Sequence, residues 1–171
     1  MYNGEFRNDN INGHGKLVHP NGDEYEGQWI DNKSNGIGTY IHANGTQYTG
    51  QWKDDRQHGY GKEVWSDGSQ YEGEYWEGMK HGTGKFSLTD GSVYQGDFCM
   101  NLIQGKGIYI WCDNKKYQGE WEDNTMQGTG LMTWPDGKQY TGLFDKGLRH
   151  GQGKLVYRDG REYEGEWVQG K

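Results

Sequence analysis

The sequence predicts an all-β protein, built as one elongated, twisted antiparallel sheet of consecutive β-hairpins with an aromatic-lined groove. Three observations favour this fold class. The 171 residues include 31 Gly and a single Ala, Ala43, a composition that disfavours helices. A Tyr returns every 23 residues along the whole chain. Asn-Gly or Asp-Gly pairs, which are frequent in hairpin turns, return with nearly the same regularity.

The repeat has no insertion or deletion. Its first residues are Tyr2, Tyr25, Tyr48, Tyr71, Tyr94, Tyr117, Tyr140 and Tyr163. Each Tyr is followed two residues later by Gly and four residues later by an aromatic residue, as in Tyr25-Glu-Gly-Gln-Trp29. This period of two predicts a strand that carries these side chains on one face. We therefore expect residues 1–171 to form a single array of seven full repeats and one closing strand.

A second strand is expected in each repeat, between a Gly-x-Gly pair and the Asn-Gly or Asp-Gly turn. The lengths predict a first strand of about six residues, a loop of about six residues, and then this second strand. A turn of three residues after His19-Pro20 would lead to the next repeat. In the register that we expect, Tyr2 lies opposite His19, and Gly27 lies beside Leu17, so that small residues face large ones.

The opposite face gives this register an independent check. In it Lys62 lies opposite Glu74, and unlike charges meet in the same way in other repeats. A charged sheet face of this kind is typical of a solvated surface. The face that carries the tyrosines would instead form a continuous aromatic row.

The repeat resembles the MORN motif, the "membrane occupation and recognition nexus". The segment that carries the resemblance best is Tyr71-Glu-Gly-Glu-Tyr-Trp-Glu-Gly-Met-Lys-His-Gly-Thr-Gly-Lys-Phe-Ser-Leu-Thr-Asp-Gly91. The resemblance covers the whole chain and implies a sheet of hairpins in a family that mostly scaffolds, tethers or positions other components. Catalysis in such proteins usually belongs to a separate domain.

Charge and hydropathy argue against several classes of partner. The net charge of −7 and the isoelectric point near 5.3 disfavour nucleic acid and anionic lipid. The longest apolar run, Ile108 to Cys112, is far shorter than the roughly 18 residues of a membrane span. We expect no signal peptide and reduced Cys99 and Cys112, and hence a cytoplasmic protein. The family resemblance implies association with the cytoskeleton or a cilium.

Candidates for chemistry are weak. His58 and His81 occupy the same repeat position, but equivalent positions lie about 9.6 Å apart, two strand spacings, whereas zinc ligands bind at about 2 Å. The cysteines fall at different repeat positions without a base partner. We therefore predict no catalytic residues, no metal site, no cofactor and no enzymatic activity.

The leading function hypothesis is an adaptor that binds a protein partner, either an amphipathic helix or an extended peptide, in the aromatic groove. Tyr and Trp dominate protein interfaces because they offer large contact areas at a low cost in rotamer entropy. The groove residues that we predict lie in the middle of the array: Trp52, Trp65, Tyr71, Tyr75, Tyr94, Trp111 and Trp121. The same aromatics could instead serve only to pack on one another.

Two alternatives belong to other classes. The first is self-assembly into a homo-oligomer through uncapped sheet edges, where Tyr2, Phe6, Tyr163 and Trp167 would lie. The second is a phospholipid-membrane tether or the regulatory module of a lipid kinase, which the family resemblance suggests. Direct membrane binding is not favoured, because acidic residues outnumber basic ones 25 to 18 and no run of four Lys or Arg exists.

Overall fold

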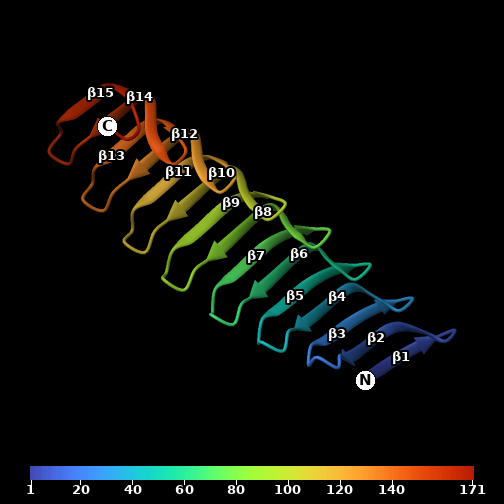
Figure 1. Ribbon diagram of the computed structural model, residues 1–171. Coiled ribbons are helices and arrows are strands. Elements are labelled where there is room, and N and C mark those ends of the chain that lie inside the picture. Colours follow the sequence, from blue (N-terminus) through green and yellow to red (C-terminus); the bar gives the residue numbers. More distant parts are fainter. The chain divides into compact units, whose positions relative to one another are not determined.

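The computed structural model describes residues 1–171 and consists of β-strands joined by short turns (Figure 1). The strands are β1 (Tyr2–Arg7), β2 (Asn10–Val18), β3 (Glu24–Ile30), β4 (Lys33–Ile41), β5 (Gln47–Lys53), β6 (Arg56–Val64), β7 (Gln70–Trp76), β8 (Met79–Ser87), β9 (Val93–Cys99), β10 (Leu102–Ile110), β11 (Lys116–Glu122), β12 (Thr125–Thr133), β13 (Gln139–Asp145), β14 (Leu148–Val156) and β15 (Glu162–Trp167).

These strands form one 15-stranded sheet in sequence order, and every described pairing is antiparallel. The all-β fold of consecutive hairpins is thus confirmed. The chain divides into two compact units, Met1–Thr89 and Asp90–Lys171, called unit 1 and unit 2 below. Each unit is described by itself.

Each odd-numbered strand joins the next strand through a two-residue turn. The expected loop of about six residues is wrong. In the β3–β4 turn, Asp31 and Asn32 have φ of +46° and +66°, which is the type I′ geometry that matches the twist of a hairpin. Asn, Asp and Gly tolerate this left-handed backbone, and Gly78 and Gly147 occupy the second turn position in other repeats.

Within each unit, an even-numbered strand joins the next one through a three-residue turn, which has the expected length but begins one residue earlier than expected, at Pro20 in the first repeat. The His19 N–H donates to the Asp23 carbonyl (2.8 Å), and the Gly22 N–H donates to the His19 carbonyl (3.0 Å). The loop therefore consists of residues 20–22, and Gly22 takes the left-handed position with φ of +90°. Its closing pair is His19 and Asp23.

The strand register differs from the expected one by two residues. Tyr2 lies opposite Leu17, not His19, and Gly27 lies opposite Gly15. A shift of two leaves each side chain on its predicted face. It changes which residues are opposite one another on neighbouring strands, because Gly now lies opposite Gly at the centre of every described hairpin.

The pairing of unlike charges on the opposite face does not distinguish the expected register from the observed one. Lys62 lies opposite Glu72 rather than Glu74, and Lys154 lies opposite Glu164 rather than Glu166. Both registers pair unlike charges, because the repeat often places an acidic residue on each side of its Gly.

A tyrosine ring fills the space that each pair of facing glycines leaves. Tyr25 is 2% exposed, and a Cβ added to Gly38 would lie 2.3 Å from the Tyr25 Oη. The Tyr25 hydroxyl donates to the Gln28 carbonyl at 3.0 Å. All eight repeat tyrosines donate in the same way, to the carbonyl three residues further on.

These rings pack edge to face with the aromatic residue four positions later. Tyr25 contacts Trp29 in its own strand and Trp52 in the next odd strand, with ring centroids 4.9 and 5.2 Å apart. The pattern continues through each unit, and we call these residues the aromatic column. The Trp29 Nε1–H also donates to the Gly15 carbonyl at 3.0 Å. The column is the core of the protein.

A β-bulge lies in each even-numbered strand, opposite the residue three positions after the repeat Tyr. In most repeats the polar side chain of that residue accepts a hydrogen bond from a backbone N–H of the bulge. The Thr83 N–H has no ladder partner there and donates to the Glu74 carboxylate (3.1 Å), which also accepts from the Thr83 hydroxyl (2.8 Å). Glu120 does the same for Thr129, and Gln28 does it for Ile37. The residue three positions after each Tyr is thus structural in most repeats.

We predict that Gly38→Ala destabilises the protein by about 1–3 kcal/mol, because the new methyl group overlaps the Tyr25 ring. In a Tyr25→Ala background the same Gly38→Ala change is expected to be neutral or slightly stabilising, because Ala suits a strand interior better than Gly. Urea denaturation followed by Trp fluorescence measures all four proteins. Equal effects of Gly38→Ala in both backgrounds would exclude the ring as the cause.

The bulge carboxylates predict an acid-sensitive component of stability. The Thr83 N–H lowers the pKa of Glu74, and the Thr129 N–H lowers the pKa of Glu120. A depressed folded-state pKa stabilises the fold above the unfolded pKa of about 4.3, and this stabilisation is lost as the pH falls through the folded pKa.

The double variant Glu74→Gln, Glu120→Gln retains both acceptors and removes both titrations. We expect it to match the parent protein near pH 7 and to lose less stability between about pH 5 and pH 3. Thermal melts at several pH values test this. Parallel curves for the two proteins would rule out these carboxylates as the source.

Candidate functional site

The aromatic column contains five of the seven predicted groove residues, and four of these five are buried. Tyr71 and Tyr94 are 0% exposed, Tyr75 is 3% exposed and Trp121 is 7% exposed. Burial raises the pKa of the Tyr71, Tyr94 and Tyr117 phenols, with that of Tyr117 at about 12, so these three stay protonated at neutral pH. These residues already contact their own chain, and in this structure they offer almost no area to a partner.

The other three predicted groove residues are half-buried. The Trp52 Nε1–H donates to the Gly38 carbonyl (3.0 Å), so this ring extends the column. Trp65 and Trp111 instead begin three-residue turns. The groove role of the seven residues stays a prediction, and Trp65 and Trp111 are the members that have both exposed surface and a position outside the column.

Trp65 and Trp111 belong to a second set of side chains, which we call the turn row. Its members start the three-residue turns: His19, His42 and Trp65 in unit 1, and Trp111, Trp134 and Tyr157 in unit 2. Tyr157 is 40% exposed, and the two Trp rings of unit 2 are half-buried. Sequence reasoning placed Trp134 and Tyr157 on the aromatic face but did not select them; their equivalence to Trp111 was the signal.

Main-chain hydrogen bonds fix the backbone of each turn-row residue. The Trp134 N–H donates to the Lys138 carbonyl (2.9 Å), and the Trp134 carbonyl accepts from the Gly137 N–H (3.0 Å). The Asp136 carboxylate accepts from the Lys138 N–H at 2.9 Å. The turns of Trp111 and Tyr157 repeat this arrangement. The row is therefore a set of rings that project from hydrogen-bonded turns of one geometry.

Every aromatic ring in the turn row of unit 2 carries a cation. The Lys115 Nζ lies 4.2 Å from the ring centroid of Trp111, and the Lys138 Nζ lies 4.4 Å from that of Trp134. The Arg161 guanidinium lies 5.2 Å from the Tyr157 ring and also pairs with Asp159 at 2.8 Å. Cation–π attraction orders these otherwise flexible side chains beside the rings.

Unit 1 has a different, internally satisfied arrangement. The Lys80 Nζ lies 4.7 Å from the Trp65 ring and 3.2 Å from the Glu63 carboxylate, which also accepts from the Tyr75 hydroxyl (3.1 Å). Nearer the N-terminus, the Tyr40 hydroxyl donates to the Asp23 carboxylate at 2.7 Å. The Ala43 N–H and this hydroxyl lower the pKa of Asp23. The polar groups that surround the turn row of unit 1 are thus largely paired with one another.

The predicted self-association residues lie in the edge strands β1 and β15, each with one neighbouring strand in the sheet. Phe6 is 64% exposed and Tyr163 is 49% exposed, while Tyr2 is half-buried. Trp167 is only 6% exposed, because the Arg149 guanidinium lies 4.2 Å from its ring.

The face opposite the column carries mixed charges and a shallow hollow. In unit 1 a depression of about 380 Å³ lies over β2, β3 and β4, lined by His14, Lys16 and Ile37 among others, with Lys16 and Glu24 paired at 2.7 Å.

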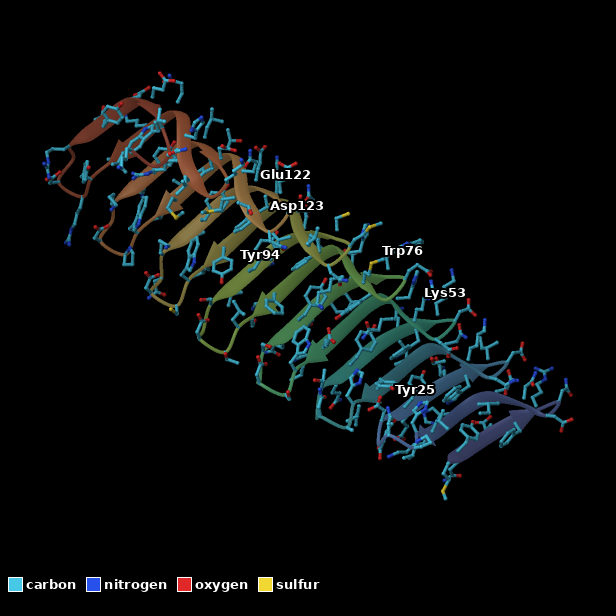
Figure 2. All side chains as sticks on the ribbon, in the orientation of Figure 1. Tyr25, Lys53, Trp76, Tyr94, Glu122 and Asp123 are labelled. Carbon is cyan, nitrogen blue, oxygen red and sulfur yellow. The ribbon has the colours of Figure 1, made fainter.

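Figure 2 shows Tyr25 lying over the strands of unit 1, whereas Lys53 and Trp76 lie at the edge formed by the two-residue turns.

Other kinds of site have little geometric support. No three His, Cys, Asp or Glu side chains gather as a metal ion would require. Cys99 and Cys112 are free and exposed. No helix is long and apolar enough to cross a bilayer.

Comparison with known proteins identifies the repeat. The model of the MORN repeat family matches residues 2–24, 25–47, 48–70, 71–93, 94–116, 117–139, 140–160 and 163–171. These boundaries confirm seven full repeats and a partial closing one. No curated protein sequence shows a significant match.

Two solved domains share the fold at low sequence identity. One is the TCP domain of SAS-4 (dCPAP) of Drosophila melanogaster, in complex with a proline-rich motif of Ana2 (dSTIL). It is 12% identical, with a TM-score of 0.56 over 91% of this chain and 84% of that one. The other is the G-box domain of the microcephaly protein CPAP, 15% identical, with a TM-score of 0.51 over 91% and 88%.

We predict that substitutions in the column lower the free energy of unfolding much more than substitutions in the turn row do. Tyr117→Ala removes a fully buried ring and should cost about 3–5 kcal/mol. Trp134→Ala removes a half-buried ring outside the column and should cost less than about 1.5 kcal/mol. Urea denaturation of the two variants makes the comparison. Similar losses would mean that the turn row belongs to the core.

Proposed function

Because the chain belongs to the MORN repeat family, we propose that it is a non-enzymatic scaffold that holds an extended segment of a partner protein. The binding surface is the turn row of unit 2, formed by Trp111, Trp134 and Tyr157. The observation that carries the proposal is the combination of ring exposure and rigid turn geometry in these three residues. Rings already ordered in the free protein lose little entropy on binding.

The two domains of similar fold support a peptide partner. The SAS-4 domain was solved with a proline-rich motif of another protein, and a role in centriole elongation has been suggested for the CPAP G-box domain. A single open sheet offers few enclosed sites, so a segment that lies across several strands suits it better than a small ligand does. The scaffold would position its partner in a cytoskeletal or ciliary assembly.

Self-assembly is the second candidate function. Its specific support is the exposure of Phe6 on β1 and of Tyr163 on β15. An edge strand with unpaired backbone groups can accept a strand from another chain. A phospholipid tether or a regulatory module of a lipid kinase has weaker support, because acidic residues outnumber basic ones 25 to 18 in this chain.

The proposal predicts peptide binding that depends on the turn row. An array of designed peptides, with helical, strand-like and proline-rich members, is probed with the full chain and with a Trp111→Ala, Trp134→Ala, Tyr157→Ala variant. We expect some peptides to bind the parent protein and to lose more than about fivefold in affinity with the variant.

Trp76→Ala is the matched control, because Trp76 is 52% exposed and lies at the two-residue turns of unit 1. It should bind the same peptides as the parent protein does. If no peptide depends on the turn row, or if the control loses binding equally, this function is excluded.

A further inference from the structure

We infer that the segment held by the turn row of unit 2 is a polyproline II helix that crosses the strands, with one proline contact per MORN repeat and carboxylates between the prolines. This inference rests on the proposed function and names the conformation and chemistry of the partner. It decides between the helix and the extended peptide that the sequence leaves open. Three features of unit 2 carry it: the spacing of the row, its cations and its rigidity.

The spacing of the row fits the pitch of polyproline II. Trp111, Trp134 and Tyr157 begin equivalent turns in successive repeats, and their strands lie two apart in the sheet. Two strand spacings amount to about 9.6 Å. A polyproline II helix has three residues per turn and rises about 3.1 Å per residue, so one side chain returns to the same face about every 9.3 Å. Over the two steps between three sites the mismatch is only about 0.6 Å.

The other regular conformations fit this spacing less well. An α-helix returns to nearly the same face after seven residues, about 10.5 Å, and drifts by about 1.8 Å over two steps. A β-strand covers about 10 Å in three residues, but an odd number of residues turns the side chain to the opposite face. Among these conformations, polyproline II alone repeats both its distance and its direction once per MORN repeat.

The cations of the row complement such a segment. Lys115 and Lys138 place an ammonium group beside their rings, and neither forms an ion pair in the structure. Arg161 adds a guanidinium at the third site, although Asp159 pairs with it. A polyproline II backbone makes no internal hydrogen bonds, so its carbonyl groups are free to accept from these donors.

Charge favours acidic residues between the prolines. The nearest carboxylates of the row, those of Asp113 and Asp136, accept hydrogen bonds from the Lys115 and Lys138 N–H groups of their own turns. Each ammonium group therefore remains available for a carboxylate of the partner. Aromatic-lined surfaces that recognise prolines exploit the low entropy of the preformed helix in the same way.

The test uses labelled peptides of equal length and measures their affinity for the full chain by fluorescence anisotropy. The first peptide repeats Pro-Pro-Glu four times. The second has the same composition in the order Pro-Pro-Pro-Glu-Glu-Pro-Pro-Pro-Glu-Glu-Pro-Pro, in which no three prolines follow one another at three-residue intervals. The third replaces each Glu of the first by Lys. We expect the first to bind about tenfold more tightly than either of the others, and Trp134→Ala to weaken it by more than about fivefold. Trp76→Ala should leave it unchanged.

Each outcome decides a separate part of the inference. Equal binding of the first two peptides overturns the three-residue period, and equal binding of the first and third overturns the charge preference. If helical or strand-like array peptides bind in a row-dependent way while none of the proline peptides binds, the inference fails and the proposed function stands. If no peptide depends on the row, both fail.

Discussion

The structure depends on one contact, a tyrosine ring that lies over two facing glycines. The ring needs the space that the missing Cβ atoms leave, as the 2.3 Å approach at Gly38 shows. Its hydroxyl satisfies a carbonyl beside the bulge, and its edges meet the aromatic residues of two odd strands. A sheet with few aliphatic residues can thus still exclude water, because aromatic rings bury a large area each. The 23-residue period preserves this contact in every repeat.

Much of the fold could be predicted from the sequence, because alternation and turn residues are local signals. The face of every side chain and the three-residue turns follow from them. The register does not, because moving the pairing by two residues keeps every face unchanged. The charge pattern failed to decide for a related reason: Glu72 and Glu74 both offer Lys62 an opposite charge. The position of the turns and the packing of Tyr on two glycines select the register together: a three-residue turn that begins one residue earlier moves the pairing by two.

The candidate site was harder to predict than the fold. Tyr71 and Trp65 are both aromatic residues on the predicted aromatic face, yet one is fully buried and the other begins a half-exposed turn. The difference arises from position in the strand: Tyr71 precedes Gly73 by two residues and covers the glycine pair, whereas Trp65 stands at the start of a three-residue turn. The Gly seven residues after the repeat Tyr, as Gly78 is after Tyr71, was the available signal for the two-residue turns. With them, the second strand would have been extended toward the two-residue turn.

The repeat separates the residues that hold the sheet together from those that can vary. The column position is Tyr in all eight repeats, and the facing glycines accompany it. The turn row instead changes from His19 and His42 to Trp65, and then to Trp111, Trp134 and Tyr157, while the hydrogen bonds of its turns stay the same. The lattice therefore tolerates substitution at this row at little cost in stability. A surface with constant spacing and variable side chains can acquire a partner in one unit while the other unit keeps its own pairs, as Lys80 and Glu63 do in unit 1.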